Sequence, residues 1–220
     1  MNDQLVIIGA GGHGEVIADI AKKNGYTDIV FLDDNLLLKK CGQYAVCGSC
    51  ADIEQHRGKC FVVAIGNNLK RQEIQEKLIE AGERLVTLIH PNAVVGEGVS
   101  LGEGTVVMAG AVINPYCKIG KGCIVNTCAS VDHDCIIGDY AHVSVGAHLA
   151  GYVVIGEKTW VGIGAVVSNN IQITDHCMIG AGAVVLHDLM ESATYIGIPA
   201  KKCLMKRKSF IDFECSLVHW

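Results

Sequence analysis

Branched aliphatic residues recur at every sixth position through the second half of the chain. The series runs without a break from Ile89 to Val185, and every member is Ile, Leu or Val. An amphipathic helix would instead place its apolar residues three or four apart. A spacing of six kept over seventeen positions is therefore an internal repeat. The members are Ile89, Val95, Leu101, Val107, Ile113, Ile119, Val125, Val131, Ile137, Val143, Leu149, Ile155, Val161, Val167, Ile173, Ile179 and Val185.

Mostly small residues lie two places before each of these aliphatic anchors, as at Ala111, Cys117 and Ala129. Residues two apart in a strand share a face, so each hexad presents one large and one small side chain to the same interior. Glycine often follows the anchor directly, as at Gly96 and Gly102, and we assign these positions to corners. Short straight segments joined by tight corners predict a parallel β-helix.

The first 88 residues follow a different pattern, in which short apolar runs alternate with longer amphipathic stretches. Short apolar runs bounded by turn residues are typical of buried strands, and the longer stretches are typical of helices. Their alternation predicts a half-sized Rossmann-like βαβαβ unit. We expect strands at residues 5–8, 28–32, 60–65 and 84–88, and helices at residues 15–24 and 70–81.

The glycine-rich segment GAGGHG at residues 9–14 follows the first expected strand and opens the first expected helix. Such glycines let backbone N–H groups approach a phosphate, while Asp33 or Asp34 after the second strand can accept hydrogen bonds from a ribose. A second glycine turn, at Gly66, ends a strand at the same edge of the sheet. Because 88 residues leave no separate domain for a hydride acceptor, we favour a nucleotide-bearing substrate over NAD.

Composition and charge narrow the functional classes. Eighteen basic against 23 acidic residues give a net charge of -5, so no positive field favours nucleic acid or an anionic membrane. The start lacks the basic leader of a signal peptide, and no apolar stretch is long enough for a membrane span. Eleven cysteines, an odd count without an export signal, indicate reduced thiols and a cytoplasmic location. Cys47 and Cys50 form a lone CxxC pair, which is a weak indication of metal or redox chemistry.

Seven segments together are highly specific: GAGGHG at 9–14, FLDD at 31–34, VAIGNN at 63–68, IHP at 89–91, VNTCASVDHD at 125–134, IGDYAHVSVGAHLAG at 137–151 and IGIPAK at 196–201. With the hexads, they resemble the bacterial hexapeptide acyltransferases of the sialic acid O-acetyltransferase and UDP-4-amino-sugar N-acetyltransferase type. The resemblance runs from about residue 5 to residue 202. It implies a left-handed β-helix with three faces, and hence between five and six coils.

The resemblance also implies a homotrimer with active sites between neighbouring columns and acetyl-CoA as the donor. We expect no metal, because the sequence offers no third ligand at a suitable spacing from His142 and His148. The chain then divides into a nucleotide-sugar-binding domain at 1–88, an acyltransferase domain at 89–202 and a tail at 203–220. His133 is implied as the general base, Asp134 as the acid that raises its basicity, and His142 as a contact of acetyl-CoA. The other implied contacts are Gly151, Ile163 and Ala181 for acetyl-CoA, and Gly11, Gly12, His13, Asp33, Asp34 and Gly66 for the nucleotide sugar.

The chemistry of acyl transfer from a thioester requires a base, an acid partner that orients it and donors for the oxyanion, independently of the resemblance. An amine or hydroxyl that attacks a thioester must lose a proton, which an imidazole with a pKa of about 6.5 accepts at neutral pH. Neighbours in a strand point to opposite faces, so Asp134 orients His133 only at a corner, and Asp132 is the alternative partner. Backbone N–H groups or His142 would stabilise the oxyanion. Because no Ser or Cys nucleophile is required, we predict direct transfer in a ternary complex.

Several alternatives stay open. His142 and His148 stand six apart, on one face of successive hexads, and would serve as metal ligands if a third were present. The acceptor is the amine of a UDP-4-amino-4,6-dideoxy sugar or, alternatively, a hydroxyl of sialic acid. A non-catalytic, β-helical, nucleotide-binding subunit is the alternative outside enzymes. The basic residues that would meet the CoA phosphates, or simply be solvated, are Lys201, Lys202, Lys206, Arg207 and Lys208.

Overall fold

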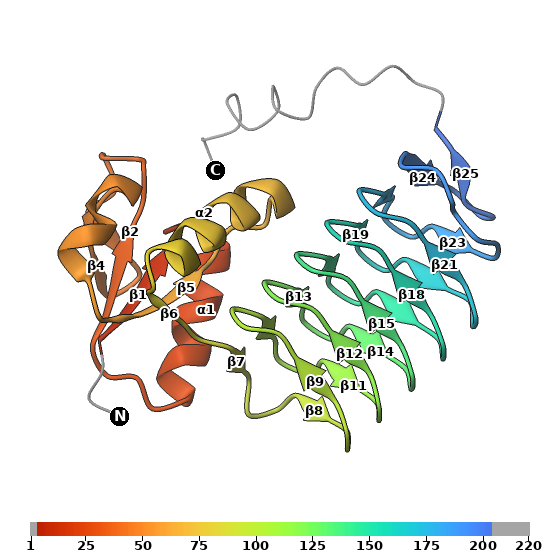
Figure 1. Cartoon of the computed structure of the whole chain (residues 1–220), viewed down its shortest axis with the longest axis horizontal. Helices are drawn as coiled ribbons and strands as arrows, with labels where there is room; N and C mark the ends of the chain where they lie inside the picture. Colours follow the sequence, from red (N-terminus) through yellow and green to blue (C-terminus); the bar gives the residue numbers. More distant parts are fainter. Residues whose placement is uncertain (1–3, 204–220) are drawn as a thin grey trace.

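The computed structural model describes residues 4–203 and shows two parts side by side. An open sheet with two α-helices forms the N-terminal part, and a column of short strands forms the remainder (Figure 1). This is the mixed architecture that the sequence predicts, a Rossmann-like α/β domain followed by a left-handed parallel β-helix. None of the helices in residues 4–203 has the length and apolar character that crossing a bilayer requires.

In the described chain, the N-terminal sheet has six strands in the order β3-β4-β2-β1-β5-β6. The central strand β1 is buried throughout and pairs in parallel with β2 and β5. Leu5 and Ile7 face α1, whereas Val6 and Ile8 face α2, so a helix covers each side of the sheet. The elements are β1 (Leu5–Ile8), α1 (Gly12–Lys23), β2 (Ile29–Leu32), β3 (Lys40–Cys41), β4 (Tyr44–Gly48), a 3-10 helix (Cys50–His56), β5 (Cys60–Val63), α2 (Asn68–Glu80) and β6 (Arg84–Leu85).

The strand expected at 60–65 ends at Val63, and the 3-10 helix at Cys50–His56 was not predicted. Three larger differences separate these elements from the sequence prediction. α1 begins at Gly12, inside the glycine motif, and α2 begins at Asn68, where the Asn67 side chain accepts a hydrogen bond from the Lys70 backbone N–H at 3.0 Å. The sequence misses the hairpin of β3 and β4, because β3 has two residues and β4 is nowhere fully buried. The expected strand at 84–88 is split, since β6 closes the N-terminal sheet and β7 (Leu88–Ile89) joins the column. The proposed domain boundary between residues 88 and 89 falls within β7.

The column winds from β7 to β23 in two-residue strands, and every third strand along the chain pairs in parallel. Val106, for example, pairs with Leu88 below it and Ile124 above it. Each anchor of the six-residue repeat is the second residue of its strand, as predicted. The strands after β7 are β8 (Val94–Val95), β9 (Ser100–Leu101), β10 (Val106–Val107), β11 (Val112–Ile113), β12 (Lys118–Ile119), β13 (Ile124–Val125), β14 (Ser130–Val131), β15 (Ile136–Ile137), β16 (His142–Val143), β17 (His148–Leu149), β18 (Val154–Ile155), β19 (Trp160–Val161), β20 (Val166–Val167), β21 (Gln172–Ile173), β22 (Met178–Ile179) and β23 (Val184–Val185), followed by β24 (Thr194–Ile196) and β25 (Lys201–Lys202).

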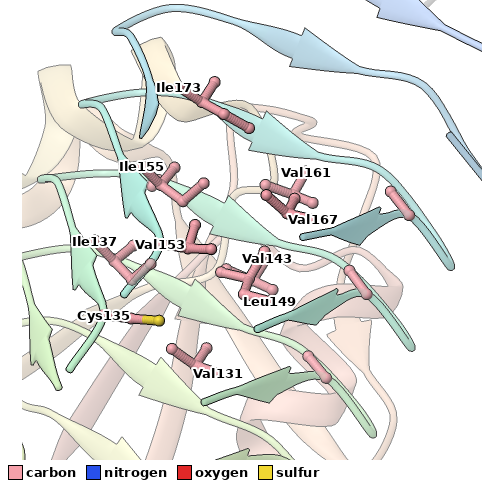
Figure 2. Packing of buried hydrophobic residues seen from close by; sticks show 14 of the residues in the cluster. Val131, Cys135, Ile137, Val143, Leu149, Val153, Ile155, Val161, Val167 and Ile173 are labelled. Carbon is pink, nitrogen blue, oxygen red and sulfur yellow. The ribbon is translucent and has the colours of Figure 1, made fainter. Parts of the chain in front are cut away.

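Three sheets, which are parallel except for the antiparallel pair of β24 and β25, therefore enclose one interior. In residues 88–202 they contain eight strands (β7 to β25), six strands (β8 to β23) and five strands (β9 to β21). Figure 2 shows anchors such as Val131, Val143 and Ile155 directed into the space between the sheets. Cys117 and Cys135 fill the small inward position, where they are fully buried. The predicted inward pair of a large and a mostly small residue is confirmed, with Val153 and Ile171 as larger members at the small position.

The corners correct one part of the sequence interpretation. Glycines directly after the anchors, such as Gly102, do not have positive φ. A Cβ at Gly102 would lie 2.3 Å from the backbone nitrogen of Lys121, so the close approach of the next coil requires glycine there. The left-handed residue comes two positions later and itself recurs every six residues, with Asp134 (φ 58°) and Tyr140 (φ 58°) among the members that are not glycine.

The two parts share a hydrophobic interface. Leu88, Val106 and Ile124 point outward from the eight-stranded sheet and are buried in one cluster with Ile17 and Ile20 of α1. The N-terminal domain is thereby fixed against this one sheet of the column. Of the predicted tail, residues 204–220 lie outside the described residues, and so do the candidate CoA contacts Lys206, Arg207 and Lys208.

Candidate active site

His133 and Asp134 form a pair at the corner between β14 and β15. The positive φ of Asp134 turns the chain so that neighbouring side chains meet, as the pairing of adjacent residues requires. Nδ1 of His133 lies 2.9 Å from Oδ2 of Asp134. When Nδ1 donates to this carboxylate, Nε2 is left as the basic nitrogen. The His133 side chain is 48% exposed, so a substrate can reach it.

Asp132, the alternative partner, is hydrogen-bonded to the backbone of His133 and not to its imidazole. Its Oδ1 accepts hydrogen bonds from the His133 backbone N–H at 2.9 Å and from Nδ2 of Asn114 at 2.7 Å. These bonds lower the pKa of the Asp132 carboxyl. Asp132 therefore holds the turn in place while Asp134 alone orients the ring.

Gly151 lies one coil above His133 and gives the ring room. A Cβ at Gly151 would be 2.7 Å from Nε2 of His133, closer than van der Waals contact allows. The ring of Tyr152 meets the imidazole edge-on, with centroids 5.1 Å apart. Beside this corner, a surface hollow of about 320 Å³ has the polar residues Asn114, Ser130, Asp132 and His148 in its lining.

His142 lies elsewhere, in β16 on the eight-stranded sheet that faces the N-terminal domain. It is 5% exposed, and Nδ2 of Asn126 lies 3.0 Å from its Nε2. The ring packs against Trp160 with centroids 4.4 Å apart. Burial, and then the Arg71 cation, lower the pKa of His142 to about 3, although the Gly66 backbone partly opposes this. His142 is thus a neutral hydrogen-bonding group.

His13, at the start of α1, belongs to the same region between the domains. Burial and the nearby Arg71 lower the pKa of His13 to about 4, and the His13 side chain in turn contributes to the low pKa of His142. Gly66 adjoins this region, because a Cβ there would lie 3.9 Å from the Trp160 ring. His13, Gly66 and His142 therefore come together, although they lie far apart in the sequence.

The glycine motif combines close packing with open space. A Cβ at Gly14 would lie 2.2 Å from the Gly9 carbonyl oxygen, whereas a Cβ at Gly11 or Gly12 would meet nothing within 4 Å. Gly11 caps α1 without a side chain, so the first backbone N–H groups of this helix face the open side. This geometry suits a phosphate-bearing ligand.

Both predicted ribose contacts already bind the backbone. Asp33 Oδ2 accepts from the Ala10 N–H at 2.7 Å, and Asp34 Oδ1 accepts from the Cys50 N–H at 3.0 Å. Asp33 also lines a hollow of about 150 Å³ next to β4. Because a carboxylate oxygen can accept more than one hydrogen bond, these contacts leave both residues able to bind a ligand.

Ile163 and Ala181 lie together at a further edge of the column, between the eight-stranded and six-stranded sheets. The Gly182 N–H donates to the Ile163 carbonyl at 2.8 Å, so the two turns are stacked. One chain thus holds the predicted site residues in separate places: His133, Asp134 and Gly151 at one corner, Ile163 and Ala181 at another, and His142 with His13 and Gly66 at the domain interface.

The structure disfavours a metal site at His142 and His148 and redox or metal chemistry at Cys47 and Cys50. His142 and His148 lie on different sheets of one coil and not on one face, which corrects the sequence-based placement. Burial raises the pKa of the Cys50 thiol to about 12, which disfavours the thiolate that a CxxC pair needs. Among residues 4–203, no three His, Cys, Asp or Glu side chains gather as a metal site would require.

Lys202, a candidate contact of the CoA phosphates, lies in β25 and forms an ion pair with Glu191.

The sequence interpretation missed Asn114, Asn126 and Arg71. The two asparagines directly follow the anchors Ile113 and Val125, at the position where glycine is common. A polar side chain at that position of the hexad was the available signal, because it projects at the corner beside the catalytic candidates. Arg71 gave no such signal, since a basic residue in a helix is usually exposed.

Comparisons with known proteins agree with this architecture. Residues 4–78 match the PglD N-terminal domain, and residues 152–187 match the bacterial transferase hexapeptide (six repeats). A UDP-N-acetylbacillosamine N-acetyltransferase of Bacillus subtilis is 37% identical over 110 residues, which are 48% of this chain and 51% of that protein. The matched region spans about half the length of the curated relatives.

Solved structures match over nearly the whole chain. The acetyltransferase domain of PglB from Neisseria gonorrhoeae, in complex with acetyl coenzyme A, is 40% identical, with a TM-score of 0.88 over 92% of this chain and 100% of that one. PerB from Caulobacter crescentus, in complex with CoA and GDP-perosamine, is 40% identical, with a TM-score of 0.85 over 91% of this chain and 97% of that one. The chain therefore belongs to the hexapeptide-repeat sugar N-acetyltransferases that carry a PglD-type N-terminal domain.

Proposed function

We propose that the protein transfers an acetyl group from acetyl-CoA to the 4-amine of a UDP-4-amino-4,6-dideoxy sugar. The observation that carries this proposal is the exposed His133 with the Asp134 carboxylate at 2.9 Å from its Nδ1. The relatives support the two substrate classes, because one is a UDP-N-acetylbacillosamine N-acetyltransferase and two solved structures hold acetyl-CoA or CoA. PerB holds GDP-perosamine, so the test of the nucleotide base compares a UDP-linked with a GDP-linked acceptor.

The proposed reaction is a direct transfer in a ternary complex. The amine nitrogen attacks the thioester carbonyl and forms the new C–N bond, and Nε2 of His133 takes the proton that the amine loses. The C–S bond then breaks, and the proton leaves with the sulfur as free CoA. Asp134 stabilises the imidazolium that forms in between, because its carboxylate holds the Nδ1–H. Backbone N–H groups at the corners, or His142, would stabilise the oxyanion.

A second copy of the chain is needed to complete this site. His133 projects at the corner between the six-stranded and five-stranded sheets, whereas the N-terminal domain lies against the eight-stranded sheet. One chain therefore keeps its base apart from its own nucleotide pocket. In the proposed homotrimer, His133 of one protomer meets the nucleotide pocket and His142 of its neighbour, and Gly151, Ile163 and Ala181 line the crevice for acetyl-CoA.

We place the reaction in the cytoplasm. Of the eleven cysteines in the sequence, no two are joined by a disulfide within residues 4–203. Cysteines without disulfides are typical of a reducing compartment.

The test measures CoA release with a thiol reagent in the presence of a UDP-4-amino sugar, a GDP-4-amino sugar or sialic acid. We expect the UDP-amino sugar to give the highest kcat/KM. His133→Ala should lower this value about 10²- to 10⁴-fold, while nucleotide binding measured by calorimetry stays intact. A higher kcat/KM with sialic acid would show that the acceptor is sialic acid and not an amino sugar. Release of CoA without an acceptor, or an unchanged rate in His133→Ala, would refute the mechanism. Nucleotide binding without any acyl transfer would identify a non-catalytic subunit.

A further inference from the structure

Helix α2 buries a polar face against the column. Asn68, Arg71 and Gln75 lie on one side of the helix and are 7%, 1% and 0% exposed. On the other side, Ile74 and Leu78 pack into the core of the N-terminal sheet. Figure 1 shows α2 on the side of the N-terminal domain that faces the column. Buried polar groups persist only where they find partners, so this face must have a specific docking surface.

That surface is a row of backbone carbonyls along one corner of the β-helix. Nδ2 of Asn68 donates to the Lys158 carbonyl at 2.9 Å, and Nε2 of Gln75 donates to the Gly104 carbonyl at 3.2 Å. Between them, Arg71 donates to the carbonyls of Tyr140 and Gly122, at 2.6 Å and 2.7 Å. All four acceptors are the left-handed corner residues of successive coils.

The spacing of the helix and the coils explains why an arginine lies at the centre. From Asn68 to Gln75 the helix rises about 10 Å, whereas three steps between coils, each about 4.8 Å, span about 14 Å. A guanidinium that bonds two successive carbonyls makes up this difference. Asn68, Arg71 and Gln75 thus bond to four successive coils, which fixes the position of α2 along the column.

Arg71 also holds the turn that ends β5. Its Nη1 donates to the carbonyls of Ile65 and Gly66, both at 2.9 Å, and its Nη2 donates to Oδ1 of Asn68 at 2.9 Å. With the two bonds to the column, all five N–H groups of the guanidinium are used. Within residues 4–203, no carboxylate lies within ion-pair distance of Arg71.

We propose that Arg71 is a positioning residue for the acceptor site: it locks the Gly66 turn of the nucleotide pocket to the coils that carry Tyr140 and His142. This inference rests on the proposed function, because it names a residue that orients the same pocket. Gly66 lies against Trp160, and Trp160 packs on His142. A shift of the Gly66 turn would therefore move the pocket relative to the acetyl-transfer site.

Burying a cation without a counter-charge costs free energy. We infer that this position needs an arginine for the directions of its five hydrogen bonds. Lysine would keep the charge but lose the planar fork that bonds four separate carbonyls. The same cation favours the neutral forms of His13 and His142, the two imidazoles that adjoin the pocket. Arg71→Lys therefore separates the geometry from the charge.

The experiment compares Arg71→Lys with Gln75→Ala in the full chain. Gln75→Ala removes one bond to the column but none to the Gly66 turn, so it controls for weakened docking alone. For Arg71→Lys we expect the KM of the nucleotide-sugar acceptor to rise about tenfold, with the KM of acetyl-CoA within twofold. Hydrogen exchange of a peptide spanning residues 64–72 should accelerate in Arg71→Lys and stay unchanged in Gln75→Ala.

Two outcomes would overturn the inference. One is an unchanged acceptor KM and unchanged exchange in Arg71→Lys. The other is an equal change in both KM values and in both variants, which would indicate a purely structural role. If the wild-type protein acetylates no amino sugar, the proposed function fails, whereas the exchange measurement still decides whether Arg71 holds the Gly66 turn.

Discussion

Two histidines of the same repeat lie in opposite environments. His133 projects at an exposed corner, with a carboxylate 2.9 Å from its Nδ1. His142 lies between the domains at 5% exposure, with an amide as its partner and a cation nearby. A general base must be reachable and must gain stability when it takes a proton. His133 is exposed and paired with a carboxylate, as the proposed base requires, whereas His142 is buried beside a cation.

Removing the carboxylate partner should remove most of this difference. Asp134→Asn should lower kcat/KM about 100-fold, because the amide no longer stabilises the imidazolium. Asparagine tolerates positive φ well, so the corner at Asp134 should keep its shape. Steady-state kinetics of acetyl transfer would measure the loss.

Asp132→Asn is the matched control for that variant. Its carboxylate contacts the His133 backbone but not the ring, so we expect less than about a fivefold loss. Equal losses in the two variants would show that the local negative charge matters and the contact to Nδ1 does not.

Crowding the exposed ring should have a smaller effect. In Gly151→Ala, the new methyl group would lie 2.7 Å from Nε2 of His133 and must displace the ring. We expect kcat/KM to fall about tenfold because the base is misplaced. The φ of Gly151 is not in the left-handed region, so the backbone tolerates alanine, and the melting temperature should change little. Wild-type kinetics in this variant would mean that His133 acts from another position.

We expect the low pKa of the buried His142 to make the stability of the protein depend on pH. Its pKa is about 6.5 in the unfolded chain and about 3 in the folded one, so only the unfolded chain binds a proton between these values. The contribution of His142 to the free energy of unfolding is therefore complete above about pH 6.5. Below that pH it decreases by about 1.4 kcal/mol for each unit by which the pH is lowered, until the folded chain also binds the proton. His13, whose folded pKa is about 4, adds a loss of the same sign.

Urea unfolding of the wild type and of His142→Phe, at pH 7 and at pH 5, measures this contribution. The variant should lose roughly half of the combined pH dependence of the two histidines. An identical pH dependence in the two proteins would mean that His142 takes up its proton normally in the folded state.

The column was predictable from the sequence because its rule is local. Each hexad repeats the same inward pair, so the anchors from Ile89 to Val185 locate every strand from β7 to β23. The family resemblance implied the pairing of His133 with Asp134, and the register permitted it because it places both residues at a corner. The reason for Gly102 did not follow, because the close approach of Lys121 comes from the neighbouring coil.

The contacts between the domains were not predictable in this way. The buried face of α2 is polar, so its composition looks like that of a solvated helix. Only the carbonyls of a distant part of the chain, such as Gly122 and Tyr140, make this face suitable for burial. The short hairpin of β3 and β4 was missed for a related reason, since its pairing partner β2 and not its own pattern keeps it in the sheet.

The central claim is that the base and the nucleotide pocket of one active site come from different copies of the chain. Mixing His133→Ala with the pocket variant His13→Ala, after unfolding and refolding them together, tests it directly. If each site joins two copies of a trimer, random mixing at equal amounts should restore about a quarter of the wild-type rate. A rate no higher than the average of the two separate variants would contradict the claim and place the complete site within a single chain.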